Sequence, residues 1–355
     1  SAQVRGRILD ASENELEAHP DVLKDSSGYG IVPFRHSHDL VDIIAGSEGT
    51  LAMIVGVELD LTEAAAATSG VMAAFPSLDD AVQAAILARE SGAAACELLD
   101  RTFIEMSSVG NVPYRTDAVL LAEVEADGES DATALARDLA TVFEREGAAA
   151  VSIALTAVEQ KEIWELRHAA SPILARLDPY LRSMQFIEDG AVPPEHLAEY
   201  VRGVRAALGD WKMRGVIFGH AGDAHVHVNP LVDVSRPDWR NSVLGLLDEV
   251  TSLTSALAGT MSGEHGDGRI RAPILSATWP EEAIKLFSAI KHCFDPAGIF
   301  NPGAKVPLGE KVLGDDNKYD PAVAPLPPRV RSLLDRISDE RLYASSRLSL
   351  LESAG

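Results

Sequence analysis

The chain has little that would bind nucleic acid, cross a membrane or hold an iron–sulfur cluster. It carries 31 basic residues against 54 acidic ones, whereas nucleic-acid surfaces need clustered lysine and arginine. No apolar run approaches the roughly 18 residues of a membrane-spanning helix. Its two cysteines, Cys96 and Cys293, cannot supply the four thiolates of a cluster. Their scarcity fits a cytoplasmic location, with peripheral attachment to the inner membrane as an alternative.

The sequence also lacks the glycine-rich loops that commonly bind a dinucleotide pyrophosphate. Neither G-x-G-x-x-G nor G-G-G occurs among its 27 glycines. The 355 residues, 46% of them hydrophobic, are nevertheless enough for two or three domains with a substantial core. With a net charge of −23, the chain can hold an anionic substrate only through a metal or local positive groups.

Two short stretches carry the strongest chemical pattern, and the first is residues 219–229 (Gly-His-Ala-Gly-Asp-Ala-His-Val-His-Val-Asn). His225, His227 and Asn229 alternate with valines, so a strand would place all three on one face. The residues before them have turn composition, and a hairpin there would fold His220 back towards the other histidines. Imidazoles on one surface are what a divalent metal needs. The alternative is a set of ordinary hydrogen-bonded histidines.

The second stretch is residues 263–268 (Gly-Glu-His-Gly-Asp-Gly). Glu264 would add a carboxylate ligand, and His265 could serve as a base. The flanking glycines indicate a tight turn that exposes side chains or lets a ligand approach the backbone. Taken alone this pair is a weak signal, and a simple turn is the alternative.

Together the two stretches resemble the C-terminal signature of the FAD-linked oxidases of the vanillyl-alcohol oxidase superfamily, G-H-x-G-D-G-N-x-H followed by G-E-H-G-x-G. More narrowly, the chain is similar to D-lactate dehydrogenase, the glycolate oxidase flavin subunit and D-2-hydroxyglutarate dehydrogenase. The variant at Glu264–Arg269 is similar to large members fused to an iron–sulfur module. Further matches follow the family's order at Lys24–Tyr29, Gly46–Leu51, Glu97–Asp100, Glu188–Asp189 with Val192–Pro193, and Phe294–Gly303.

The resemblance implies an α+β fold: an antiparallel-sheet cap (substrate) domain with helices on one face, and a partial FAD-binding domain. Alternating strand and helix patterns agree with such a sheet. Residues 51–61 and 186–188 read as strands and residues 12–18 as a helix. Because the pyrophosphate loop is missing, the N-terminal flavin-binding half is expected to be absent. The expected divisions are the C-terminal part of the FAD domain at 1–62, the cap at 63–285, a segment returning to the FAD domain at 286–308, and a tail or linker at 309–355.

The resemblance also assigns residues to cofactors and substrate. His220, His227 and Glu264 would hold a divalent metal, zinc in the first place and manganese or iron as alternatives. His265 would be the base. Arg167, in a W-x-x-R context within a predicted helix, would grip the substrate carboxylate, the alternative being a solvated helix arginine. Contacts to FAD are expected from Tyr29, Gly46, Ser47, Glu48, Gly49 and Asn301, with Lys24 a weaker candidate.

One departure from the family pattern falls inside the metal motif. The usual Gly-Asn is Ala224-His225 here, while His227 aligns with the family ligand. His225 could therefore be an extra ligand, a replacement base or a surface residue. Asp189 is expected to have a structural or supporting role.

The implied function is FAD- and metal-dependent oxidation of a D-2-hydroxy acid (lactate, 2-hydroxyglutarate or glycolate class) to the 2-oxo acid, by hydride transfer to flavin. The electron acceptor or an iron–sulfur partner would lie outside the chain, and a homodimer is considered. The alternative is a cap fragment or subunit that binds metal and substrate but lacks a complete FAD site and is inactive alone. A degenerate binding or assembly subunit is a weaker third interpretation, because the metal residues are intact.

Overall fold

The computed structural model describes residues 20–107, 115–168, 180–309 and 327–339, with residues 5, 6, 8, 9, 113 and 342 besides. The chain forms two compact units, Ser1–Lys318 and Tyr319–Gly355. The second unit contains the helix α14 (Pro328–Asp339). The strands and all other described helices belong to the first unit. The helix expected at 12–18 lies outside the described residues.

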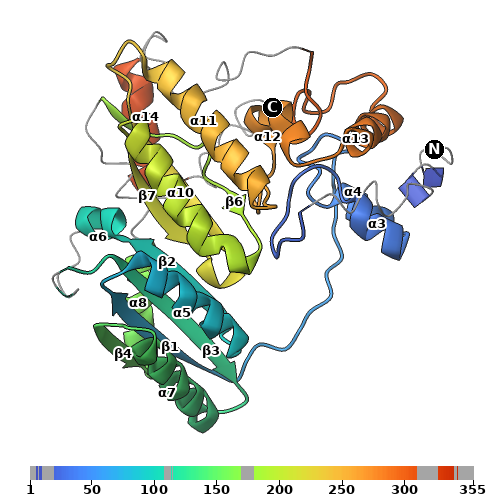
Figure 1. Ribbon diagram of the computed structural model, residues 1–355. Coiled ribbons are helices and arrows are strands. Elements are labelled where there is room, and N and C mark those ends of the chain that lie inside the picture. Colours follow the sequence, from blue (N-terminus) through green and yellow to red (C-terminus); the bar gives the residue numbers. More distant parts are fainter. Residues whose placement is uncertain are drawn as a thin grey trace. The chain divides into compact units, whose positions relative to one another are not determined.

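An eight-stranded antiparallel sheet runs through the first unit (Figure 1). Its order is β4-β1-β3-β2-β7-β8-β5, and β6 pairs with β8. The predicted α+β fold with an antiparallel sheet is therefore confirmed. The strands are β1 (Ala67–Phe75), β2 (Ala95–Asp100), β3 (Ala118–Ala126), β4 (Ala150–Ala154), β5 (Leu181–Ser183), β6 (Gly190–Ala191), β7 (Arg214–Gly219) and β8 (His225–Asp233).

Helices pack on both faces of this sheet, not on one alone. Phe75 of β1 packs on Phe143 of α7, with ring centroids 6.0 Å apart. Its neighbour Ala74 packs with Ile163 of α8 in a separate core, because adjacent residues of a strand point to opposite faces. Phe103 of α6 joins the α8 side. The α7 side carries α5 (Leu78–Glu90), α7 (Glu129–Arg145), α10 (Leu197–Asp210) and α11 (Trp239–Ala256); the other carries α6 (Arg101–Ser107) and α8 (Ala157–His168).

These helices form because their apolar residues recur every three or four positions. In α7 the buried side chains are Ala132, Ala136, Leu139, Ala140 and Phe143, which lie on one stripe. α5 begins where the Ser77 side chain accepts a hydrogen bond from the amide of Asp80, 3.3 Å away. Among the described residues, no helix is both long and apolar enough to cross a membrane.

A second core joins segments that are far apart in the sequence. Tyr29, Phe34 and Leu51 pack there with Trp279 and Phe287. The expected boundary at residues 285 and 286 lies within α13 (Glu281–Phe294) and stays a prediction. The elements of this part are α3 (Ile31–Ser37), α4 (Leu40–Ile44), α12 (Gly268–Arg271), α13 (Glu281–Phe294) and the 3-10 helix η3 (Ala272–Ala277); another 3-10 helix, η1 (Pro194–His196), precedes α10.

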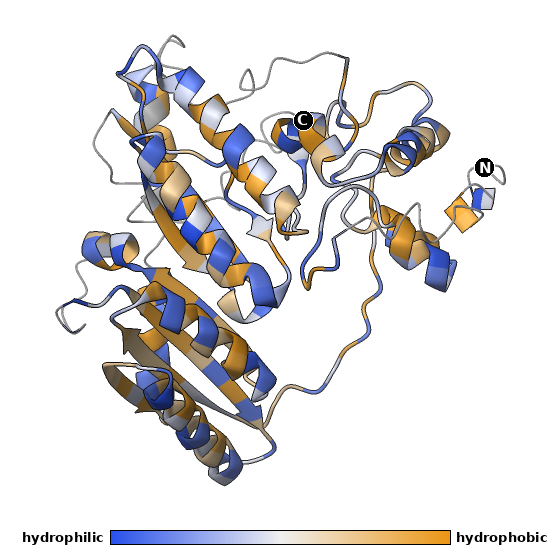
Figure 2. Ribbon diagram, viewed as in Figure 1, coloured by the Kyte–Doolittle hydropathy of each residue, from blue (hydrophilic) through white to orange (hydrophobic). Residues whose placement is uncertain are grey.

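Residues 52–66 link this core to β1 as a long trace without a strand (Figure 1). The prediction of a strand at 51–61 is therefore wrong. Alternation favours an extended backbone, but a strand needs a paired neighbour, and none lies beside this segment among the described residues. Met53, Val55 and Val57 are consequently 77%, 93% and 71% exposed. Figure 2 shows that hydrophobic residues recur along this linking segment. The strand predicted at 186–188 is also wrong: a loop there leads into β6.

Candidate metal centre

The first motif folds as the predicted hairpin. β7 and β8 pair antiparallel, with Phe218 opposite His227. The 3-10 turn η2 (Ala221–Asp223) joins them. The ring of His220 folds back, so that its centroid lies 5.6 Å from that of His225 and 5.3 Å from that of His227. The hairpin thus brings all three imidazoles together.

Glu264 brings a carboxylate to the same place. Its Oε1 lies 3.4 Å from Nε2 of His220 and 3.3 Å from Nε2 of His227. Its Oε2 lies 3.9 Å from Nδ1 of His225. One ligand atom from each of these four residues lies within 4.8 Å of all the others. Ligand bonds of about 2.2 Å place two ligand atoms on opposite sides of a metal about 4.4 Å apart, so a small contraction would bring these atoms into ligand range.

The outer ring nitrogen of each histidine is held by an oxygen. The pairs are His220 Nδ1 with the Glu97 carboxylate, His225 Nε2 with Asp189 Oδ1 at 2.9 Å, and His227 Nδ1 with the Glu188 carbonyl at 3.2 Å. Ionised carboxylates and carbonyls only accept hydrogen bonds, so each N–H sits on the outer nitrogen. Each inner nitrogen then presents a lone pair to the centre, as in metal-binding histidines.

This donor set fits a divalent metal. Three lone pairs and a carboxylate that face one another repel unless a cation lies among them. His225 Nδ1 is buried and has no hydrogen-bond partner among the described residues. Imidazole with carboxylate suits zinc, iron or manganese.

The surroundings of His227 and Glu264 favour the forms that bind metal, whereas the hydrogen bond with Glu97 raises the pKa of His220. Burial, followed by the neighbouring histidines, lowers the pKa of His227 to about 4, so this ring is neutral at pH 7. Burial alone would raise the pKa of Glu264, but the hydrogen bond from Lys24 and the nearby histidines lower it to about 2. The Lys24 ammonium lies 3.0 Å from Glu264 Oε2. Lys24, a weaker candidate for a flavin contact, therefore contacts the carboxylate of the candidate metal centre.

Arg167 contacts the same Glu97 carboxylate that holds His220. Its Nε donates to Glu97 Oε2 at 2.6 Å, and its guanidinium lies 4.9 Å from the centroid of the Phe218 ring. With 19% of its side chain exposed, it is not a solvated helix arginine. Burial opposes ionisation of Glu97, yet the hydrogen bonds with His220 and Arg167 lower its pKa to about 2.

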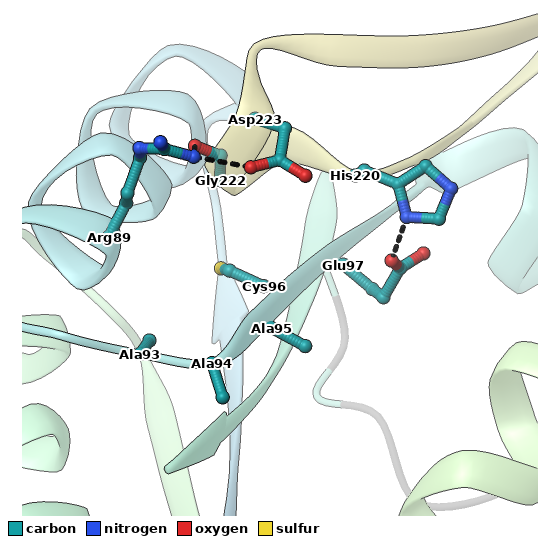
Figure 3. A pocket seen from close by; sticks show the side chains of 9 residues that line it. All are labelled: Arg89, Ala93, Ala94, Ala95, Cys96, Glu97, His220, Gly222 and Asp223. Carbon is teal, nitrogen blue, oxygen red and sulfur yellow. Dashed lines mark hydrogen bonds and ion pairs between the residues drawn. The ribbon is translucent and has the colours of Figure 1, made fainter. Parts of the chain in front are cut away.

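Glu97 and His220 line one side of a pocket of about 430 Å³, and the ion pair of Arg89 with Asp223 lines another (Figure 3). The pocket therefore lies beside the cluster of three histidines and Glu264.

His265 stands next to the cluster and is partly open to solvent. Its ring stacks on that of His227, with centroids 5.0 Å apart and planes 7° from parallel. Nδ1 lies 3.5 Å from Glu188 Oε1, and Nε2 lies 3.6 Å from Glu264 Oε1. The hydrogen bond with Glu188 raises the pKa of His265. Its side chain is 39% exposed, so a proton taken there can pass to water.

Residues 65–304 match the family described as FAD linked oxidases, C-terminal domain. The chain belongs to this family. Among similar proteins, the glycolate oxidase subunit GlcD of Bacillus subtilis is 29% identical over 79% of this chain and 58% of its own. A D-lactate dehydrogenase of Archaeoglobus fulgidus is 30% identical over 80% of this chain and 60% of its own. A D-2-hydroxyglutarate dehydrogenase of Pantoea ananatis is 29% identical over 85% and 32%. The chain thus spans about a third to three fifths of these relatives.

Solved structures of the same fold are more distant in sequence. The 4-ethylphenol oxidase of Gulosibacter chungangensis superposes with a TM-score of 0.55 at 13% identity, covering 70% of this chain and 55% of its own. p-Cresol methylhydroxylase superposes with a TM-score of 0.50 at 10% identity, covering 70% of this chain and 54% of its own. These likenesses bear on the fold alone.

The residues that the resemblance assigns to flavin tie the early segment of this family member to the Glu264 loop. The Glu48 carboxylate accepts hydrogen bonds from the amides of Asp267 and Gly268, at 2.8 and 3.0 Å. The Asn301 side chain donates to the Glu48 carbonyl at 2.8 Å. Tyr29 is 1% exposed, and its hydroxyl bonds Thr50 at 2.7 Å. Gly46, Ser47 and Gly49 form the turn around Glu48, with φ of +70° and +66° at the two glycines. Their flavin contacts stay predictions.

Three buried charged residues, Asp189, Arg271 and Lys305, hold the site in place, and the sequence indicated only the first of them. The Asp189 carboxylate accepts the amide of His265 at 2.8 Å, the supporting role expected for it. Arg271 donates to Glu188 Oε1 at 2.9 Å, and Lys305 is buried between Glu48 and Asp267. Sequence reasoning missed Arg271 and Lys305, since nothing local distinguishes them from surface residues.

Proposed function

We propose that this chain provides the metal- and substrate-binding part of an FAD-dependent dehydrogenase that converts a D-2-hydroxy acid to the 2-oxo acid. The supporting observation is the convergence of His220, His227 and Glu264, with the outer nitrogen of each imidazole held by an oxygen. Membership of an FAD-linked oxidase family supports FAD as the redox cofactor. The names of the relatives support glycolate, D-lactate or D-2-hydroxyglutarate as the substrate class.

His220, His227 and Glu264 would hold the metal. When bound, the metal supplies Lewis acidity that lowers the pKa of a hydroxyl, and FAD supplies a hydride acceptor. His265 takes the hydroxyl proton at Nε2, because its Nδ1 faces Glu188. Arg167 uses Nε for Glu97 and offers its terminal nitrogens to the substrate carboxylate.

Metal analysis and a visible absorption spectrum of one purified sample test this function. We expect stoichiometric metal in the unchanged chain and in Glu162→Gln, an exposed control, but weak binding in Glu264→Gln. If a flavin band is present, D-lactate, glycolate and D-2-hydroxyglutarate should be tried for bleaching it. A folded chain without affinity for zinc, manganese or iron would contradict the proposal.

A second candidate function is a subunit or fragment that binds metal and substrate but needs another polypeptide to hold FAD. The exposed segment 52–61 favours it, since Val55, Leu59 and Leu61 are 93%, 73% and 89% exposed. Apolar side chains in such a run are usually covered by a partner. Bound metal without a flavin band, followed by uptake of FAD when a flavin-domain polypeptide is supplied, would support this candidate. The electron acceptor would lie outside the chain in either case, and a cytoplasmic location is proposed.

A further inference from the structure

We propose that His225 is a fourth protein ligand of the metal, and that three imidazoles with one carboxylate select a metal that accepts six ligands. This inference rests on the metal site of the proposed function. It adds a ligand that the three-residue site does not require, and it narrows the choice of metal.

The burial of His225 supports a bond at its inner nitrogen. The side chain is 0% exposed, and Nε2 bonds Asp189 Oδ1 at 2.9 Å. Nδ1 has no hydrogen-bond partner in the part of the chain that the structure describes, and it lies 3.9 Å from Glu264 Oε2. A buried polar atom without a partner costs about 1–3 kcal/mol. A metal bound at Nδ1 removes that cost.

Asp189 and Gly263 fix the position of this ring relative to the Glu264 loop. The fully buried Asp189 carboxylate accepts the Glu264 amide at 3.2 Å as well as the His225 N–H. Ring and loop are therefore anchored on one group. A Cβ at position 263 would lie 2.7 Å from the His225 ring, so only glycine lets the loop come this close.

The two other roles considered for His225 fit less well. A surface residue is excluded by its complete burial. A base with solvent contact can pass its proton directly to water, and Nδ1 of His225 has no such contact. His265, at 39% exposed, has that contact. A ligand needs only a lone pair aimed at the centre, which His225 offers.

Four protein ligands restrict which metals can also bind the substrate. Lys24 holds Glu264 Oε2 at 3.0 Å, which leaves Oε1 to bind the metal. Tetrahedral zinc would be saturated by four protein ligands, as in structural sites. A 2-hydroxy acid that chelates through its hydroxyl and one carboxylate oxygen needs two further positions. Manganese and iron accept six ligands, so we infer one of these as the working metal.

X-ray absorption of the metal-stripped full chain reloaded with Mn²⁺ counts the imidazole ligands. We expect three in the unchanged chain and two in His225→Asn, whose amide can still donate to Asp189. The Kd for Mn²⁺ should rise at least tenfold in this variant, about the lower bound for loss of even an outer-shell partner. His36→Asn, an exposed control on α3, should match the unchanged chain.

The choice of metal has its own readout in the Co²⁺-loaded chain. Weak ligand-field bands, as six-coordinate Co²⁺ gives, are expected with D-lactate present, whereas intense tetrahedral bands would overturn the six-ligand inference. Two imidazoles in the unchanged chain, or an unchanged Kd in folded His225→Asn, would overturn the ligand assignment alone. No Mn²⁺ or Zn²⁺ bound by the unchanged chain would remove the metal site itself. If His225→Asn does not fold, the imidazole count on the unchanged chain decides.

Discussion

Replacing Lys305 by methionine tests how the loop that carries Glu264 is held in place. The Lys305 side chain is 0% exposed. Its ammonium lies 2.5 Å from the Ser26 carbonyl, 3.1 Å from Glu48 Oε1 and 3.3 Å from Asp267 Oδ2. Methionine keeps most of the length of the side chain but removes the charge and three donors. The change therefore isolates the electrostatic part of the interaction between Lys305 and its three partners.

Removing one partner of a buried ion pair costs about 3–5 kcal/mol. Asp267 keeps hydrogen bonds from Gly28 and Ser27, at 2.8 and 3.0 Å, so we expect a loss near the lower end, about 3 kcal/mol at pH 8. Burial already raises the pKa of Asp267, and Lys305 is the main group that opposes the rise. Without Lys305 that pKa rises further. The carboxyl then takes up a proton at lower pH, and the loss should be smaller at pH 5 than at pH 8.

Urea denaturation at both pH values measures this loss. Lys285→Met is the matched control: this lysine is 50% exposed and pairs with Glu281 and Glu282 at 2.8 and 2.7 Å. Such surface pairs contribute about 0–1 kcal/mol. Metal affinity should fall in Lys305→Met only, because the Glu264 loop loses its anchor. Equal losses of stability in the two variants, or a larger loss at pH 5, would refute the reasoning.

Three further changes probe other parts of the chain. Arg167→Met should weaken D-lactate binding to the metal-loaded chain about tenfold or more by calorimetry, whereas Arg214→Met, 63% exposed, should not; equal effects would count against Arg167. Burial raises the pKa of Asp100 to about 6, so Asp100→Asn should gain up to about 3 kcal/mol in unfolding free energy above pH 6 and little below pH 4. A gain independent of pH would contradict this. Val55→Ser with Val57→Ser should leave thermal stability of the chain alone unchanged but reduce association with a flavin-domain polypeptide in a pull-down; a large loss of stability would show that the segment is already covered.

The hairpin was predictable because its information is local. Alternation at His225 and His227 sets the strand face, and the turn before them brings His220 back within the same short stretch. The prediction of a strand at 51–61 was wrong because strand formation there depends on distant segments. Alternation fixes local propensity only, while pairing depends on what lies alongside. The supports of the site depend on distant segments in the same way: Arg271 and Lys305 are buried only because Glu188, Glu48 and Asp267 surround them.

The acidic composition argues against binding of an anion, and the candidate metal centre offers a local explanation for how one could bind. Four carboxylates converge there, those of Glu97, Glu188, Asp189 and Glu264. Three cations contact them, Arg167, Arg271 and Lys24. Counting these carboxylates and cations alone, four negative and three positive charges leave −1, which repels a carboxylate. A divalent cation on the histidines turns −1 into +1, which attracts one. Binding of an anionic hydroxy acid should therefore be tighter with the metal present even where no bond to it forms, because a divalent cation reverses the sign of this local charge.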